Sequence, residues 1–528
     1  MDFSRLVALL SSPDAYPHPV DAVELHQTHI SAVFLAGPYA YKIKKPLDLG
    51  FLDFTTLERR AHFCREEVRL NRRLAPTVYL GVVPVALGGG RLRVDGEGDV
   101  AEWAVWMRRL PDEATLRHLL ARGDAGEDVL VRFGRRLAAF HAGAEAGEHV
   151  SACAGWPVVA RNARENFEQT ANQVGEAVSA AVWDRVRTLT ERRLADSRAL
   201  IEDRARRGLA RDTHGDLHLD HVYVFPDREP PDDLVAVDCI EFNERFRYAD
   251  PVADASFLVM DLIFTGRRGL ARLFANAYFE AARDAGGADL LPLYVAYRAA
   301  VRAKVEGMKS REAEVPPRER REARQRAGAH WLLALGQLEE PAARPCLVLV
   351  GGLPGTGKST LARGLAEAAG FQVISSDEVR KELAGLAPTE SAAADFGAGL
   401  YTAAWNDRVY AECLRRAEEA LSQGRRVAVD ASFREEGRRR AFLGAARRWA
   451  VPAVLLLCRA DGETVRRRLS SRIGDASDAT WEVHRRAAAV WEEAGAEVRA
   501  ASRDIASGDD PGAALGCALS ALSSVDLL

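Results

Sequence analysis

The sequence predicts two domains in series, an α+β domain followed by an α/β domain. The chain has 528 residues, and a single hydrophobic core stops growing at about 250 to 300 residues, so two domains are the simplest expectation. Short strand-like runs are concentrated before residue 111 and are followed by mostly helical sequence, whereas strand and helix patterns alternate after residue 345. Hydrophobic residues make up 48% and charged residues 28% of the chain, which is typical of globular proteins.

The composition also limits the partners and the compartment. A net charge of -4 gives no overall attraction for phosphate backbones, so nucleic acid is a partner that is not favoured. The seven cysteines are scattered and never form a C-x-x-C pair, which favours reduced thiols over a disulfide framework or a zinc site. Because no apolar stretch of about 18 residues occurs and the N-terminus lacks a signal-like run, we expect a cytoplasmic protein with no membrane segment.

The first predicted domain, residues 1–340, begins with a small sheet-rich lobe. A Gly-Pro turn separates its first two strand-like runs, and after Pro111 the pattern becomes mostly helical, with two further strand-like interruptions. The expected strands are residues 31–37, 39–45, 78–87, 91–94 and 102–110, with a helix at 56–74 and the later interruptions at 213–225 and 233–242. Residues 312–345 read as a charged helix, a short helical turn and a Pro-punctuated linker, so we place the domain boundary near residue 340.

The second predicted domain, residues 341–528, alternates continuous apolar strands with helices. Such strands are typical of a parallel sheet that is covered by helices on both faces. The expected order is strand 346–352, helix 358–370, strand 371–377, helices, strand 426–432, helix, strand 453–460 and more helix.

A glycine-rich motif lies between the first strand and the first helix of this domain. Residues 352–359, GLPGTGKS, match G-x-x-x-x-G-K-S in the strand-to-helix context that the motif requires. Its glycines let the backbone N–H groups turn inward toward a phosphate chain, Lys358 would reach the β and γ phosphates, and Ser359 would ligate Mg²⁺. We therefore predict an ATP-binding loop made of Gly352, Leu353, Pro354, Gly355, Thr356, Gly357, Lys358, Ser359 and Thr360.

Two carboxylates follow later strands of the same sheet, where open α/β sheets bind their substrates. Asp377 could accept a proton from an attacking hydroxyl, with Arg380 one turn later steadying an anionic group. The alternative is that Asp377 caps a helix and that Arg380 is solvated. Asp430 ends the strand at 426–432 and could hold the Mg²⁺ water shell or the acceptor, unless it too is a simple cap.

An arginine-rich segment comes before a Gly-containing break at residue 474. Guanidinium groups on a lid suit the charged transition state of phosphoryl transfer, although most charge runs are solvated helix faces. Among Arg466, Arg467, Arg468 and Arg472, the preferred lid pair is Arg468 and Arg472, four residues apart.

The segments GLPGTGKST, SSDEVRKEL and VAVDAS, followed by R-x-x-x-R and SDA, resemble the P-loop small-molecule and polynucleotide kinases labelled AAA_33 or predicted kinases. The resemblance covers about residues 345–500. In polynucleotide kinases of this kind a D-x-x-R supplies the base and the phosphate anchor, which the resemblance assigns to Asp377 and Arg380. It leaves the acceptor open.

The first domain carries its own phosphotransfer pattern. Asp216 of His214-Gly215-Asp216 is the predicted base, and Asp238, at the end of a later apolar strand, is the predicted metal ligand. Lys42 lies where this lobe needs an ammonium for the α and β phosphates, with Glu67 as its helix partner. The rival choices are Lys44 and Glu66, because a reading one or two residues out changes the assignment.

The segments YAYKIKK, REEVRLNRRL, EWAVWMRRLP, THGDLHLDH and VAVDCIEFNERFRYADP resemble the aminoglycoside phosphotransferase and choline kinase family over about residues 25–310. The order of the two halves is that of the subgroup in which such a domain is fused to a P-loop kinase. The resemblance implies a protein-kinase-like bilobal fold. The family places Asn five residues after the catalytic Asp to bind the second Mg²⁺, and here that position is His221. This substitution implies metal ligation by His221 with altered metal use, weak activity or a pseudokinase role, since Mg²⁺ prefers oxygen.

The pattern as a whole predicts ATP- and Mg²⁺-dependent transfer of the γ-phosphate to a hydroxyl of a small molecule, at two sites. One alternative makes the first domain a ligand-binding module that regulates a single active P-loop kinase. Another makes the second domain a nucleic-acid 5′-hydroxyl kinase. The acceptors, the coupling between the sites and the oligomeric state stay open.

Overall fold

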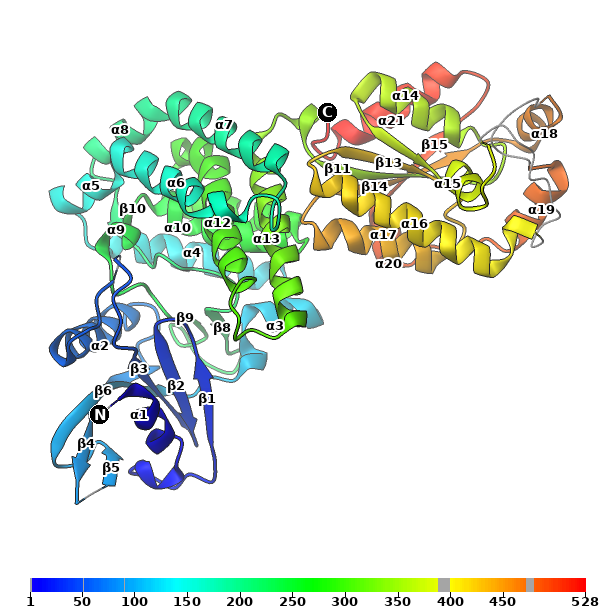
Figure 1. Ribbon diagram of the computed structural model, residues 1–528. Coiled ribbons are helices and arrows are strands. Elements are labelled where there is room, and N and C mark those ends of the chain that lie inside the picture. The colour runs from blue at the N-terminus through cyan, green and yellow to red at the C-terminus, as the bar shows by residue number, and fades with distance from the viewer. Residues whose placement is uncertain (1, 51, 90, 388–398, 472–478) are drawn as a thin grey trace. The chain divides into compact units, whose positions relative to one another are not determined.

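The computed structural model describes residues 2–50, 52–89, 91–387, 399–471 and 479–528. The chain divides into two compact units (Figure 1). The N-terminal unit comprises Met1–Arg161, Ser197–Leu262 and Arg267–Tyr294, and the C-terminal unit comprises Asn162–Asp196, Ile263–Gly266 and Val295–Leu528. The domain boundary near residue 340 stays a prediction, because the compact units exchange segments several times before that point.

The N-terminal unit begins with a six-stranded antiparallel sheet, in the order β1-β2-β3-β6-β4-β5. Helix α1 contributes to the apolar cluster on one face, and helix α2 packs against strands β6 and β4. The elements are α1 (Phe3–Leu10), β1 (Val23–Gln27), β2 (Ser31–Ala36), β3 (Tyr39–Lys44), α2 (Leu57–Asn71), β4 (Tyr79–Gly88), β5 (Arg91–Val94) and β6 (Asp99–Arg108).

The period of strand β3 decides which of its side chains face α2. Successive residues of a strand point to opposite faces, so Tyr41 and Ile43 join the cluster beside α1. Lys42 and Lys44 therefore share the opposite face. Both lysines reach the same buried carboxylate on α2, that of Glu67.

The rest of the N-terminal unit is mostly helical, with two small antiparallel pairs, β7 with β10 and β8 with β9. The predicted His-Gly-Asp segment is the loop between β7 and β8. The elements are α3 (Leu116–Arg122), α4 (Glu127–Gly143), α5 (Glu148–Ala154), α8 (Arg198–Arg206), β7 (Arg211–Asp212), β8 (Val222–Val224), β9 (Leu234–Ala236), α9 (Glu244–Arg247), β10 (Tyr248–Ala249), α10 (Pro251–Phe264) and α11 (Arg268–Ala282). A small sheet-rich lobe followed by a helical lobe is the predicted arrangement, and it is confirmed.

The C-terminal unit contains a five-stranded parallel sheet in the order β12-β13-β11-β14-β15. Helices α14 and α21 pack with one face of the sheet, and α16 and α17 contact its strands from the opposite layer (Figure 1). The elements are β11 (Cys346–Gly351), α14 (Lys358–Ala369), β12 (Gln372–Ser375), α15 (Ser376–Leu383), α16 (Ala403–Ser422), β13 (Arg426–Asp430), α17 (Glu436–Arg448), β14 (Ala453–Arg459), α18 (Gly462–Ser470), α19 (Trp481–Ala489), α20 (Ala496–Ala500), β15 (Ser502–Ala506) and α21 (Pro511–Ser523). The predicted parallel α/β sheet is confirmed.

This unit also includes all or part of the helices α6 (Trp156–Thr170), α7 (Ala180–Asp196), α12 (Leu291–Lys309) and α13 (Pro317–Leu338). The sequence prediction of a charged helix followed by a separate helical turn is wrong here, whereas the predicted linker is present, because residues 339–345 contain only a short 3₁₀ helix, Pro341–Ala343. A single 22-residue helix, α13, runs through the segment, and its residues from Ala327 to Leu335 are buried, where it packs against helices such as α7.

The last strand was also missed, because the sequence after residue 460 was expected to be helical. Strand β15 is short and lies at the edge of the sheet, with only Ile505 buried, so it lacks the continuous apolar run of the inner strands.

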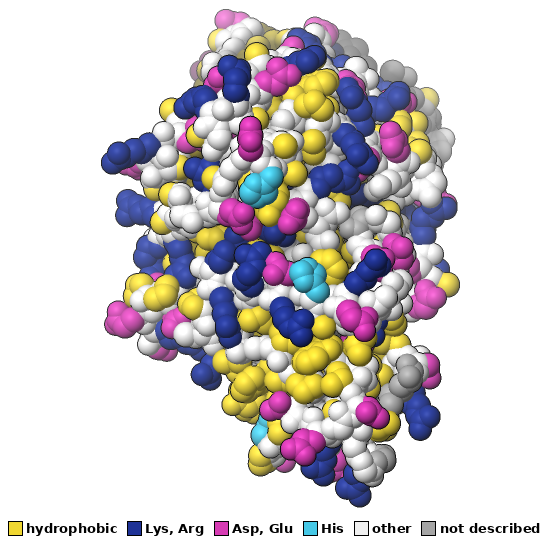
Figure 2. All heavy atoms as spheres, turned by 90° about the vertical axis from the view of Figure 1, so that its left-hand side faces the viewer, with side chains coloured by type: hydrophobic (Ala, Val, Ile, Leu, Met, Phe, Trp, Pro, Cys, Tyr) yellow, Lys and Arg dark blue, Asp and Glu magenta, His cyan; other side chains and the backbone are white. Residues whose placement is uncertain are grey.

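Within the described residues no helix is both long and apolar enough to cross a membrane. All seven cysteines are free thiols, and five of them are buried. Figure 2 shows basic and acidic side chains interspersed over the face that it draws.

Candidate active sites

The predicted P-loop forms a tight turn between β11 and α14. Gly352, Gly355 and Gly357 have φ angles of +140°, +82° and +89°, which L side chains rarely adopt. A Cβ atom at Gly352 would lie 2.7 Å from the carbonyl oxygen of Cys458. Glycine is therefore required both by the conformation and by the close approach of β14.

Lys358, Ser359 and Asp430 meet at the end of this loop. The Lys358 Nζ atom donates to the Leu353 carbonyl at 3.1 Å, so the ammonium folds back along the loop. Asp430 lies opposite Val350, where β13 runs beside β11, and interacts with the Ser359 hydroxyl. Burial raises the pKa of Asp430, although the Lys358 ammonium and the Ser359 hydroxyl act to lower it. A hydroxyl and a carboxylate are oxygen donors, which suits Mg²⁺.

Asp377 and Arg380 lie on the first turns of α15. Ser375 is the N-cap of this helix, because its hydroxyl accepts from the Glu378 N–H, so the alternative of Asp377 as a cap is wrong. The alternative of a solvated Arg380 is also wrong, since this residue is only 5% exposed. Its guanidinium donates to the Leu400 carbonyl at 2.6 Å and lies over the ring of Tyr401.

The arginines of α18 differ from one another in their surroundings. Arg468 donates to the carbonyl oxygens of Ser507 and Gly508, and its guanidinium lies 3.4 Å from where a Cβ of Gly357 would be. Arg466 stacks on Trp481 and Arg467 pairs with Asp509. Arg472 lies outside the described residues. Arg468 thus ties the loop after β15 to the beginning of α14.

Two contacts of the P-loop were not anticipated from the sequence. The Ser507 hydroxyl donates to the Thr356 carbonyl, and His484 Nδ1 lies 2.8 Å from the Pro354 carbonyl. Both residues are distant from the motif in sequence and lie in segments without a pattern of their own. Only the fold brings them to the loop.

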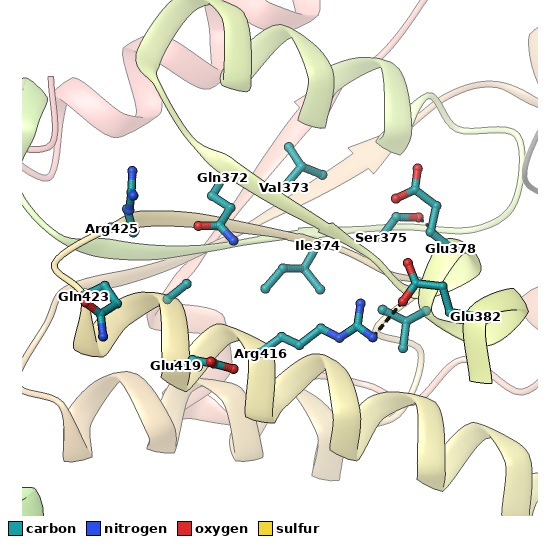
Figure 3. A pocket seen from close by; sticks show the side chains of 12 residues that line it. Gln372, Val373, Ile374, Ser375, Glu378, Glu382, Arg416, Glu419, Gln423 and Arg425 are labelled. Atoms are coloured by element: carbon teal, nitrogen blue, oxygen red, sulfur yellow. Dashed lines mark hydrogen bonds and ion pairs between the residues drawn. The ribbon is translucent and has the colours of Figure 1, made fainter. Parts of the chain in front are cut away.

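A separate open groove of about 430 Å³ runs along the edge strand β12 (Figure 3). Its lining comes from β12, α15 and α16 and includes charges of both signs, with an ion pair of 2.7 Å between Arg416 and Glu382. No residue of the P-loop lines it. The groove is therefore distinct from the phosphate-binding loop.

In the N-terminal unit, two lysines and three carboxylates form one connected network. Lys42 Nζ lies 2.9 Å from Glu67 Oε1 and 2.6 Å from Asp238 Oδ1. Lys44 Nζ lies 2.8 Å from Glu67 Oε2 and also bonds Glu241. The predicted ion pair between Lys42 and Glu67 is present, and the rival Lys44 holds the other oxygen of the same carboxylate. The rival Glu66 instead pairs with Arg69 on the helix surface.

The charges in this network are set by burial and by one another. Burial acts to lower the pKa of Lys42, but the carboxylates of Asp238 and Glu67 raise it well above its usual value. Burial acts to raise the pKa of Asp238, yet Lys42 and His221 bring it well below its usual range. Asp238 also has a φ of +64°, and its N–H donates to the Tyr79 hydroxyl at 3.1 Å. A strained, ionised aspartate held at a fixed point is typical of a ligand-binding position.

Asp254 holds the backbone of the His-Gly-Asp loop in place. This fully buried carboxylate accepts from the N–H groups of His214 and Gly215 at 3.1 and 2.8 Å, and lies 3.0 Å from His141 Nε2. Gly215 has a φ of +86° and packs closely against Ile240. The backbone that carries Asp216 is therefore held rigidly.

His221 lies between the two aspartates of the predicted site. Its Nδ1 atom is 2.8 Å from the Asp216 carbonyl oxygen, and its Nε2 atom is 3.6 Å from Asp238 Oδ2. Burial, followed by the adjacent ring of His218, lowers the pKa of His221 to about 4. The imidazole is therefore neutral at pH 7 and can offer a nitrogen lone pair to a metal.

Four contributors to this site were not singled out from the sequence: Tyr79, His218, Glu241 and Asp254. Glu241 and His218 each lie within three residues of a predicted site residue, which was the available signal. Tyr79 and Asp254 carried no signal, because each reaches the site from a separate strand or helix.

Known proteins match this chain over different parts of its length. Residues 347–494 match the family described as an AAA domain. The aminoglycoside 2′-phosphotransferase-IIIa structure matches with 16% identity and a TM-score of 0.39, covering 63% of this chain and 99% of that chain. A sugar kinase from Janibacter sp. matches with 17% identity and a TM-score of 0.26, covering 34% of this chain and 94% of that chain.

Mycobacterial proteins match most of the chain. An uncharacterized protein of Mycobacterium tuberculosis, Rv2004c, is 35% identical over 473 residues, which are 88% of this chain and 90% of the relative. An uncharacterized protein of Mycobacterium bovis matches with the same identity and the same coverage. The chain belongs to the family of these mycobacterial proteins.

Proposed function

We propose that this protein is a kinase with two sites, each of which transfers the γ-phosphate of ATP to a hydroxyl of a small molecule. The observation that carries the proposal is that each site brings a lysine together with carboxylate groups. Lys358 lies with Ser359 and Asp430 in one site, and Lys42 lies with Glu67 and Asp238 in the other.

In the P-loop domain, the backbone N–H groups and the end of α14 would bind the phosphate chain. Ser359 and Asp430 would hold Mg²⁺, which neutralises phosphate charge when bound. Asp377, on the neighbouring helix, would accept the proton of the attacking hydroxyl. Arg380 and Arg468 are proposed to steady anionic groups, and both would have to exchange a backbone carbonyl for a phosphate oxygen.

In the N-terminal domain, Lys42 would contact the α and β phosphates, while Glu67 fixes the position of its ammonium. Asp216 is the proposed base, on a loop whose backbone is fixed by Asp254. Asp238 and His221 would hold the metal. The acceptor class is proposed only as a hydroxylated small molecule.

Single substitutions test the two-site proposal. We expect Lys358→Ala and Asp216→Ala each to remove a separate part of the transfer from labelled ATP to a panel of hydroxyl compounds, and the double variant to remove all of it. Asp14→Ala, at an exposed position, is the control and is expected to match the unchanged protein. If the two single variants are both fully active, the proposal is wrong.

A regulatory role of the N-terminal domain is the second candidate, and His221 at the metal position favours it. In that case Lys358→Ala abolishes all transfer, whereas Asp216→Ala alters only its regulation by bound ligand. An oligonucleotide arm of the same panel tests 5′-hydroxyl transfer. The net charge of -4 does not favour that arm, since nucleic-acid binding calls for basic surface.

A further inference from the structure

We propose that the N-terminal site is built for a divalent transition-metal ion such as Mn²⁺ or Co²⁺, bound by His221, Asp238, His218 and Asp216. The inference rests on the proposed function in taking this site as a metal site. It goes further by naming two nitrogen ligands and the class of ion that they select. Binding of the ion does not itself require phosphoryl transfer.

The tautomer of His221 follows from its neighbours. The Asp216 carbonyl can only accept a hydrogen bond, so the His221 Nδ1 atom that lies 2.8 Å away carries the proton. In the neutral ring Nε2 then offers a lone pair. This lone pair lies 3.6 Å from Asp238 Oδ2, while the other oxygen of Asp238 is bonded to Lys42. Two hydrogen-bond acceptors at this distance repel each other unless a cation lies between them.

A second nitrogen–oxygen pair lies next to the first. His218 Nε2 is 3.8 Å from Asp216 Oδ2, and the rings of His218 and His221 are 3.7 Å apart. Asp216, His218 and His221 each offer one ligand atom, and these atoms lie within 4.8 Å of one another. Ligands that share one ion at about 2.1 Å lie about 3 to 4 Å apart, so small side-chain shifts suffice for joint coordination.

In a neighbouring cluster the carboxylate charges are balanced without a metal. Asp220 and Asp261 also lie near His218, but Arg117 pairs with both carboxylates, at 2.5 and 2.8 Å. The guanidinium already supplies the positive charge there. We therefore place the ion on the Asp216 and Asp238 side of His218.

The ligand types determine the class of ion. Mg²⁺ is hard and prefers oxygen ligands, whereas imidazole suits first-row transition metals, which bind such mixed sites more tightly along the series from Mn²⁺ to Co²⁺. The oxygen-only pair of Ser359 and Asp430 has no such preference. The two sites of one chain should thus differ in the metal that they bind.

The experiment is a Co²⁺ titration of the full chain without nucleotide, followed by visible absorption and repeated in competition with Mg²⁺. We expect a Co²⁺ site with nitrogen ligation that excess Mg²⁺ does not displace. His221→Asn, which replaces the imidazole by a smaller amide group, should weaken Co²⁺ binding about tenfold or more, and His218→Asn should do the same. His149→Gln removes a histidine that pairs with Glu145 on the surface and should have no effect.

Unchanged Co²⁺ affinity in both histidine variants would overturn the proposal, as would equal affinity of the unchanged protein for Co²⁺ and Mg²⁺. Circular dichroism checks that each variant is folded, and His221→Gln serves as the second substitution if His221→Asn is not. Failure of the proposed function has a different signature. In that case Co²⁺ binds as expected, but Asp216→Ala leaves phosphoryl transfer unchanged.

Discussion

At the scale of single residues, the most consequential group is Lys44. Its ammonium holds one oxygen of Glu67 and leaves the other to Lys42, so it orients the carboxylate that Lys42 contacts. It also neutralises Glu241, whose pKa is raised by burial. Lys44 is only 1% exposed, and its loss would leave Glu241 in the interior without its lysine partner and Glu67 with Lys42 alone.

We predict that Lys44→Met lowers the free energy of unfolding of the N-terminal unit by about 3 to 5 kcal/mol, because breaking a buried pair leaves an uncompensated charge. Urea denaturation measures this value. Lys45→Met is the matched control at the next, more exposed position and should change stability by less than about 0.5 kcal/mol. A cost for Lys44→Met as small as that of the control would show that the network is not the source of stability.

At the scale of elements, the P-loop depends on the backbone of three glycines and on helices that pack against it. A Cβ atom at Gly355 would lie 2.9 Å from Val465 Cγ1 and 3.0 Å from Leu469 Cγ, both on α18. Gly370 lies at the C-terminal end of α14, the helix that follows the P-loop. It has a φ of +67°, but a Cβ atom there would have no neighbour within 4 Å. Substitution at these two glycines therefore separates the cost of an unfavourable φ from the cost of steric contact at the phosphate loop.

We predict that Gly355→Ala weakens ATP binding about tenfold or more, because the loop must open to fit the added methyl group and its φ is unfavourable for alanine. Isothermal titration calorimetry measures the affinity. Gly370→Ala should cost about 1 kcal/mol of stability and leave ATP affinity unchanged. Equal losses of affinity in both variants would mean that the P-loop geometry is not the cause.

The inner elements could be predicted from sequence because their patterns are strong, as in the apolar strand β11 followed by the glycine-rich loop. The register of β3 could not, since Lys42 and Lys44 share a face and only the position of Glu67 shows that both are used. Strand β15 has one buried residue and no apolar run. The contacts of Ser507, His484 and Asp254 depend on segments far apart in the chain, which no local pattern records.

At the scale of the whole molecule, each candidate site is formed within one compact unit. All residues named in the N-terminal site lie in the N-terminal unit, and the P-loop site lies in the C-terminal unit. The C-terminal unit includes more than the parallel sheet, because Leu335 of α13 and Val182 of α7 both lie close to Gly424, just after α16. Arg185 of α7 also pairs with Glu339 at the end of α13.

We predict that a fragment of residues 341–528 melts at least about 4 °C below a fragment of residues 313–528, because the shorter one exposes the apolar surface that α13 covers. Differential scanning calorimetry compares the two. Equal melting temperatures would support residue 340 as the end of an independent domain.

Trp481 stacks on His484, with ring centroids 5.1 Å apart and an interplanar angle of 9°, and His484 contacts the Pro354 carbonyl. An indole is thus separated from the phosphate loop by a single imidazole. Tryptophan emission responds to shifts of its immediate environment, so this ring is a natural fluorophore for occupancy of the loop. The protein carries its own optical reporter, and binding at this site can be followed without attaching a dye.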